Sequence, residues 1–390
     1  MIDSPHAEKL HRLLSLLELD PQNLSLLKDA AHSAIDAGQW MRAEQLVAQA
    51  RGLAPQDGQL LALAAFTHLH AHRFDEAIQA FQDARDRGVD SPKLRHDLAY
   101  ALFANRQPRK AFTELRDPGI FAEVPGAWLL RARCLHHIGR IDEAIASCDA
   151  LLELEPEHAE ARGLGALLEH SRGRAFQARA LAEQALVLAP WQLEAMLTMA
   201  SLSADSGELT DARAQFKSLL QRHPSCGRGW LGLALVEMMS SRFDAARVSI
   251  ELAARHLPDH LGTWHVLAWL HVMRGDVEQA RSAFEHALSI DRNFAESHGG
   301  LAVIAAMQGR EAEAAQMIRR ALRLDPQAMS AQYAQVLLLQ AEGRYGEARE
   351  VVDAFMARPL AGGGLQYRHL LGMQMGEALA QARPDSAGLH

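Results

Sequence analysis

The sequence is poor in cysteine and aromatic residues, and it contains no long hydrophobic run. Its 390 residues include only Cys134, Cys148 and Cys226, and no two of them form a C-x-x-C pair. The cysteines therefore predict neither a structural zinc site nor a thioredoxin-type redox motif, and their scarcity indicates a reducing compartment such as the cytoplasm. No apolar stretch approaches the roughly 18 residues that a membrane span needs, so we expect no membrane insertion.

Several functional signatures are also missing. The start, MIDSPHAEKL, has neither the basic nor the apolar region of a signal peptide. A leader removed before this point would leave the same start, so a periplasmic location stays an alternative. A net charge of −8 disfavours nucleic acid as a ligand. There is no G-x-S-x-G, glycine-rich phosphate loop or H-E-x-x-H, so we expect no catalytic site, no cofactor and no enzyme activity.

The chain is instead rich in helix-forming apolar residues. Hydrophobic residues make up 48% of it but aromatic residues only 6%, which favours helices over strands. The bias to Ala, Arg and Leu suggests a bacterial source. By length alone we would expect two or three globular domains of about 150 residues each.

An internal period of 34 residues replaces that expectation with a repeat array. Alanines keep this spacing, with one gap of 33, at positions 43, 77, 111, 144, 178, 212, 246, 280, 314 and 348. Twelve residues before each stands another alanine, at 31, 65, 99, 132, 166, 200, 234, 268 and 302, with Val336 closing the series. These positions predict where paired helices approach most closely.

Glycines and prolines punctuate the same period. Glycines lie between the two alanine series at 38, 139, 173, 207, 275, 309 and 343, where a left-handed residue can end a helix. Prolines follow at 156, 190, 224, 258 and 326, with Arg292 in the vacant place. Each unit is therefore expected to be a helix, a glycine turn, a second helix and a proline-marked turn.

These residues resemble the tetratricopeptide repeat (TPR) family. Trp128, Trp230 and Trp264 occupy its early large position, Phe81, Phe216 and Phe284 its second-helix aromatic position, and the residues at 50, 84, 185, 253, 287 and 321 its second alanine. The resemblance implies an all-α, right-handed superhelical solenoid of antiparallel helix pairs. Ten repeats are expected at 24–57, 58–91, 92–124, 125–158, 159–192, 193–226, 227–260, 261–294, 295–328 and 329–362.

The ends and the third repeat depart from the pattern. Residues 1–23 contain an amphipathic helix at 6–19 that would cap the array, and 363–390 contain a helix near 365–382 that would cap it or lie in its groove. Pro108 and Pro118 interrupt the second helix of the third repeat, so 108–125 is expected to be irregular or to act as a hinge.

The resemblance also implies a concave surface lined by the first helix of each repeat. Carrying those positions over gives a largely apolar candidate binding groove: Phe66, Tyr100, Phe103, Leu129, Leu167, Leu197, Leu231, Leu235, Met238, Met239, Trp269, Met273, Val303, Met307 and Tyr333. Any one of them could equally pack in the core. Such a groove suits an extended or helical segment of a partner protein.

Other ligands are less favoured by the sequence. Lys28 and His32 lack the Asn partners of the family's carboxylate clamp, and the three asparagines are too few for an asparagine ladder. Histidines share the groove phase at 32, 70, 96, 136, 137, 170 and 265, which leaves pH-sensitive binding open. His68 and His72 have a metal-binding spacing without a third ligand, so no metal is expected.

The sequence thus predicts a non-enzymatic interaction scaffold with a protein or peptide partner. Two alternatives remain: a chaperone or adaptor for the assembly or secretion of a client, and the recruiting part of a larger enzyme such as a glycosyl- or sulfotransferase. A homo-oligomer is compatible with either.

Overall fold

The computed structural model describes residues 5–357, and every regular element in this range is an α-helix. Internal contacts divide the chain into two compact units, of which unit 1 ends at Ala161 and unit 2 begins at Arg162. Unit 1 contains α1 (Pro5–Leu19), α2 (Leu24–Asp36), α3 (Trp40–Leu53), α4 (Gly58–His70), α5 (Phe74–Asp86), α6 (Pro92–Ala104), α7 (Pro108–Glu114), α8 (Gly119–Glu123), α9 (Ala127–His137) and α10 (Ile141–Leu154).

Unit 2 continues the same pattern of helices. The boundary falls in the first turn of α11 (Ala159–Ser171). After α11 come α12 (Ala175–Leu188), α13 (Leu193–Asp205), α14 (Leu209–Arg222), α15 (Gly227–Met239), α16 (Phe243–His256), α17 (Leu261–Arg274), α18 (Val277–Ile290), α19 (Ala295–Met307), α20 (Glu311–Leu324), α21 (Met329–Ala341) and α22 (Tyr345–Met356).

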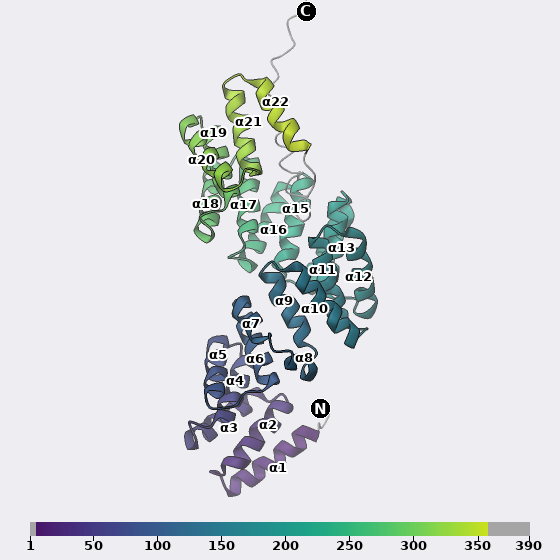
Figure 1. Ribbon diagram of the computed structural model, residues 1–390, viewed down its shortest axis with the longest axis vertical. Helices are drawn as coiled ribbons and strands as arrows, with labels where there is room; N and C mark the ends of the chain where they lie inside the picture. The colour runs from purple at the N-terminus through teal and green to yellow at the C-terminus, as the bar shows by residue number, and fades with distance from the viewer. Residues whose placement is uncertain (1–4, 358–390) are drawn as a thin grey trace, which may run out of the picture. The chain divides into compact units, whose positions relative to one another are not determined.

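Within each unit the helices form consecutive hairpins, as Figure 1 shows. The two helices of a hairpin pack together, as in α4 with α5, and the second helix also packs on the first helix of the next hairpin, as in α5 with α6. We call the first helix of each hairpin the A-helix and the second the B-helix. The 34-residue period therefore corresponds to one A-helix, one B-helix and their turns.

The two alanine series lie where the helices approach most closely. All ten alanines of the first series, and the nine alanines and Val336 of the second, have no exposed surface. A larger side chain at these sites would displace the neighbouring helix, because protein interiors leave few voids. This confirms the interpretation of the repeating alanines.

The turn between A- and B-helix contains one residue in the left-handed conformation. All seven predicted glycines have φ between 68° and 82°. At the three places where the series lacks glycine, His72, Arg106 and Ser241 adopt φ of 57°, 58° and 54°. The turn geometry is thus the same in every repeat, even where the residue type makes it unfavourable.

In the third repeat the segment after the A-helix α6 contains two short helices. Its B-helix is reduced to α7, which starts at Pro108, and to the five-residue α8 after Pro118. The α8 segment is held to α9 by the stacked rings of Phe121 and Trp128, whose centroids are 3.8 Å apart. The guanidinium of Arg131 lies 5.4 Å from the Trp128 ring. A hinge motion at 108–125 remains a prediction.

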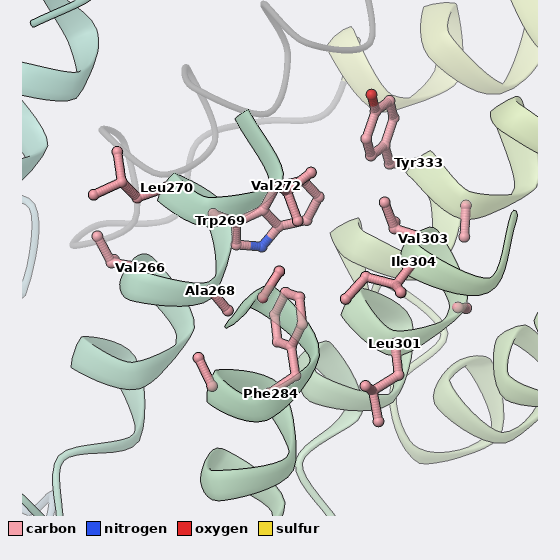
Figure 2. Packing of buried hydrophobic residues seen from close by; sticks show 14 of the residues in the cluster. Val266, Ala268, Trp269, Leu270, Val272, Phe284, Leu301, Val303, Ile304 and Tyr333 are labelled. Atoms are coloured by element: carbon pink, nitrogen blue, oxygen red, sulfur yellow. The ribbon is translucent and has the colours of Figure 1, made fainter. Parts of the chain in front are cut away.

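Aromatic and small residues alternate in the core of unit 2. Trp269 lies between Phe284 and Tyr333, at centroid distances of 6.1 and 5.7 Å (Figure 2). A Cβ at Gly300 would stand 2.3 Å from the Phe284 ring, so only glycine fits there. Gly232 has the same relation to Phe216, two repeats earlier in phase.

A polar contact also repeats at the entry of three A-helices. The indole N–H groups of Trp230 and Trp264 donate to the carbonyl oxygens of Pro224 and Pro258, at 2.9 and 2.6 Å. In the next repeat His298 Nε2 lies 3.0 Å from the carbonyl oxygen of Arg292. Where arginine replaces the turn proline, histidine thus replaces the tryptophan and keeps the contact.

The expected terminal helices have different outcomes. The helix predicted at 6–19 is α1, which packs on α2 and buries Leu10 and Leu17. The helix predicted near 365–382 lies outside the described residues, and so does the end of the tenth repeat.

Candidate partner-binding surface

The predicted groove residues all lie on A-helices, but the structure divides them by exposure. Neighbouring A-helices contact each other, as α4 with α6 and α17 with α19, so part of each A-helix faces another helix. Seven of the fifteen side chains are buried: Leu129, Leu167, Leu197, Met238, Trp269, Val303 and Tyr333. Six are half-buried: Phe66, Phe103, Leu231, Leu235, Met239 and Met273. Tyr100 and Met307 are exposed.

The buried members belong to the core. Trp269 has no exposed surface and packs between Phe284 of α18 and Tyr333 of α21, as Figure 2 shows. Val303 of α19 is equally inaccessible, whereas Met307, one turn later on the same helix, is 47% exposed. The accessible part of the predicted groove is therefore smaller than the list derived from the repeat.

In unit 1 the predicted groove residues that remain accessible are aromatic, and histidine and lysine side chains lie beside them. The rings of Trp40 and His70 are stacked at 3.7 Å, and Phe66 meets His70 edge-on at 4.7 Å. Lys93 Nζ of α6 lies 5.6 Å from the Phe66 ring centroid. Near the C-terminal end of α6, the ring of Phe103 meets that of His137 of α9 edge-on, with the ring centroids 5.3 Å apart. The sequence pattern identified neither Lys93 nor Trp40, a residue of the B-helix α3 that stacks on His70.

Other charged groups on these A-helices have polar partners. Lys28 Nζ donates to Asp57 Oδ2 at 2.5 Å and to Gln59 Oε1 at 3.3 Å. This bond holds the pKa of the Asp57 carboxyl below its usual value. Arg133 pairs with Glu160 at 3.0 Å, and His96 Nδ1 lies 3.1 Å from Asp97 Oδ1.

In unit 2 the predicted groove residues that remain accessible are aliphatic. Met239, Met273 and Met307 recur at intervals of 34 residues on α15, α17 and α19, of which the first two are half-buried and the third is exposed. Leu231 and Leu235 are half-buried on α15. Methionine side chains can adjust to partners of different shape, so this row suits apolar contact.

Unit 2 also buries several titratable groups. Glu237 of α15 is 2% exposed, and its carboxylate accepts from Arg213 Nε at 3.1 Å and lies 3.0 Å from Arg242 Nε. Glu296 accepts hydrogen bonds from the backbone N–H groups of Met329 and Ser330, while burial raises the pKa of its carboxyl. Burial lowers the pKa of His265 to about 3. These groups join helices within the core and do not form an accessible polar site.

Three further observations on residues 5–357 concern other kinds of site. No group of three or more His, Cys, Asp or Glu side chains in this range is arranged to hold a metal ion. None of the helices described is long and apolar enough to cross a membrane. Cys134 and Cys148 are buried in helices, as expected for small core residues, and burial raises the pKa of the Cys134 thiol to about 12.

Comparisons with known proteins agree with the fold. The sequence profile described as tetratricopeptide repeat matches residues 28–92, 96–156, 197–259, 265–329 and 312–362. No curated protein sequence matches the chain. Among solved structures, the Cut9–Hcn1 assembly of the APC/C is similar with a TM-score of 0.61 and 15% identity, covering 98% of this chain and 85% of the other.

A second group of similar structures comes from IFIT1. A monomeric IFIT1 mutant with Gppp-AAAA has a TM-score of 0.57 at 13% identity, covering 97% of this chain and 94% of that one. The human IFIT1 dimer with PPP-AAAA has a TM-score of 0.55 at 15% identity, covering 92% and 96%. At these identities the likeness shows a shared fold.

Proposed function

We propose that this chain, which belongs to the tetratricopeptide repeat family, binds an extended or helical segment of a partner protein on the accessible faces of its A-helices. The family and its solved relatives support a protein-interaction scaffold. The observation that carries the finer proposal is the accessible methionine row of unit 2, namely Met239, Met273 and Met307.

The energetic argument concerns how a segment would be held. Ordering an extended segment costs conformational entropy, so several apolar anchors are needed along it. Three methionines in register on consecutive A-helices offer such anchors without polar groups that would need partners. Met307 is the most accessible of the three and is therefore the best position for a test.

The test is selection of binding peptides from a displayed random library, followed by affinity measurement with purified variants. Met307→Asp places a charge in the row, whereas Met41→Asp makes the same change on the B-helix α3, where Met41 is 84% exposed. We expect Met307→Asp to weaken binding by about tenfold and Met41→Asp to change it by less than about twofold. Equal effects of the two substitutions would refute the assignment of the row.

Client capture is a distinguishable outcome of a second measurement. A chaperone or secretion adaptor would copurify with one client in a fixed ratio and lose it on Met307→Asp. A general scaffold would bind several selected sequences that share apolar spacing.

A further inference from the structure

We propose that the A-helix surface of unit 1 binds an acidic peptide segment that also contains apolar side chains, and that Lys93 is its principal cationic contact. This inference rests on the proposed scaffold function and assigns a partner chemistry to one part of it. We call the surface formed by Phe66, His70, Lys93, Tyr100, Phe103 and His137 the aromatic strip.

The two units differ in the charge that their A-helices carry. The A-helices α2, α4, α6 and α9 of unit 1 contain five Lys or Arg, three Asp and six His. In unit 2, α13, α15, α17, α19 and α21 contain two Arg, four Asp or Glu and three His. The net charge of −8 for the whole chain therefore conceals a basic, histidine-rich A-helix set in unit 1.

The aromatic strip is accessible and consists of residues on three neighbouring A-helices, α4, α6 and α9. Lys93, His70 and His137 are exposed, and Tyr100 is 46% exposed. Lys93 stands over Phe66 of α4, and Phe103 of the same helix as Lys93 meets His137 of α9. By contrast, His265 and His298 on the A-helices of unit 2 are buried.

The positive charge of Lys93 favours a negatively charged partner. In the part of the chain that the structure describes, Lys93 has no carboxylate partner, whereas Lys28 is paired with Asp57 and Arg133 with Glu160. Asp97, on the same helix as Lys93, is hydrogen-bonded to His96. An acidic segment would supply the missing carboxylate to Lys93, and its apolar side chains would cover Phe66, Tyr100 and Phe103.

A nucleic acid fits these residues less well than a peptide. Binding to a phosphate backbone requires several unpaired Lys or Arg side chains in a row, because each neutralises one phosphate. The aromatic strip offers Lys93, while Lys28, Arg95 and Arg133 on the A-helices of unit 1 already have carboxylate partners. Single-stranded RNA is nevertheless included in the test, since aromatic side chains can stack on bases.

The experiment measures fluorescence anisotropy with the full chain and three labelled peptides of one length. One alternates Asp and Glu with Leu and Phe, the second has Asn and Gln in the acidic places, and the third has Lys and Arg there. We expect the acidic peptide to bind at least about fivefold more tightly than the amide peptide and the basic peptide to bind most weakly. Equal affinity for the acidic and basic peptides would overturn the inference.

Two matched variants locate the site. Lys93→Glu should weaken the acidic peptide by about fivefold or more, whereas Lys110→Glu, the same charge change at an exposed position of the B-helix α7, should change it by less than about twofold. Tyr100→Ala should weaken both the acidic and the amide peptides. Circular dichroism and thermal melting of each variant verify that the fold is intact.

The remaining outcomes separate this inference from the scaffold proposal. If peptide binding is sensitive to Met307→Asp but not to Lys93→Glu, the strip is not the site and the scaffold function stands. If no peptide binds at all, both fail. If RNA binds more tightly than the acidic peptide and Lys93→Glu abolishes RNA binding, the strip is a nucleic-acid surface and the peptide assignment is wrong.

Discussion

Protonation of one buried histidine should couple the stability of unit 2 to pH. His265 lies in the core against the rings of Trp269, Phe284 and Phe294, and it is 4% exposed. The indole N–H of Trp269 donates to His265 Nε2 at 3.1 Å, so that nitrogen must be the unprotonated one. A second proton would place two N–H groups against each other in an apolar site.

The sign and magnitude follow from the two protonation states. Burial lowers the pKa of His265 from 6.5 in the unfolded chain to about 3 in the fold. As the pH falls, the unfolded state therefore binds this proton before the folded state does. The contribution of the neutral ring to the free energy of unfolding is complete above pH 6.5 and declines as the pH falls toward 3. At pH 5.0, which is about 1.5 units below the pKa of the unfolded state, protonation of the unfolded chain lowers the free energy of unfolding by about 2 kcal/mol relative to its value at neutral pH.

The assay is urea denaturation of unit 2, followed by tryptophan fluorescence at pH 7.5 and 5.0. His265→Gln keeps an acceptor for Trp269 but does not titrate, so its stability should fall about 2 kcal/mol less between the two pH values than that of the parent chain. His256→Gln, at an exposed position of α16, should behave like the parent. If His265→Gln and the parent lose the same stability in acid, burial does not hold this ring neutral and the reasoning is refuted.

Three further predictions concern local features of unit 2, each measured as a change in the free energy of unfolding. Ser241→Gly should stabilise the fold by about 0.5–1 kcal/mol, because Ser241 has a left-handed φ of 54° that glycine adopts more readily. Gly275→Ser, at the same repeat position, should destabilise the fold by about 1 kcal/mol. If both substitutions changed stability in the same direction, the argument from the left-handed turn would be wrong. Trp264→Phe should cost about 1 kcal/mol through loss of the indole hydrogen bond to the turn carbonyl, and an unchanged stability would show that this bond contributes nothing. Gly300→Ala should cost about 2 kcal/mol because its Cβ would overlap the Phe284 ring, whereas Gly346→Ala, with open space around it, should stabilise by up to about 1 kcal/mol.

The positions best predicted from the sequence are those where one physical cause permits few residues. The contact between paired helices leaves room for a methyl group only, so the alanine periodicity located the helix pairs directly. The left-handed turn positions restrict the residue type less than the alanine positions do. A non-glycine residue can adopt left-handed φ at a cost of about 1–2 kcal/mol, which the packed array can absorb, so His72, Arg106 and Ser241 break the series without changing the turn.

Exposure on the A-helices could not be predicted in the same way. A position within the repeat says which side of a helix a residue lies on, but its burial depends on how closely the next A-helix approaches. Gly299 illustrates this, because a Cβ there would come within 2.5 Å of the Ala331 backbone nitrogen, which brings α21 close against α19. Val303 is therefore buried while Met307 is exposed, although both lie on the same side of α19.

Chain-wide composition also hides the difference between the two candidate surfaces. A repeat array changes its surface chemistry one repeat at a time, because each repeat packs only on its neighbours and can vary its accessible residues independently. The basic and histidine-rich A-helices of unit 1 and the methionine row of unit 2 are consequences of this freedom. If Lys93→Glu weakens binding of an acidic peptide but not of an apolar peptide, and Met307→Asp does the reverse, the two surfaces select ligands separately. A single peptide that loses affinity equally with both substitutions would contradict this separation.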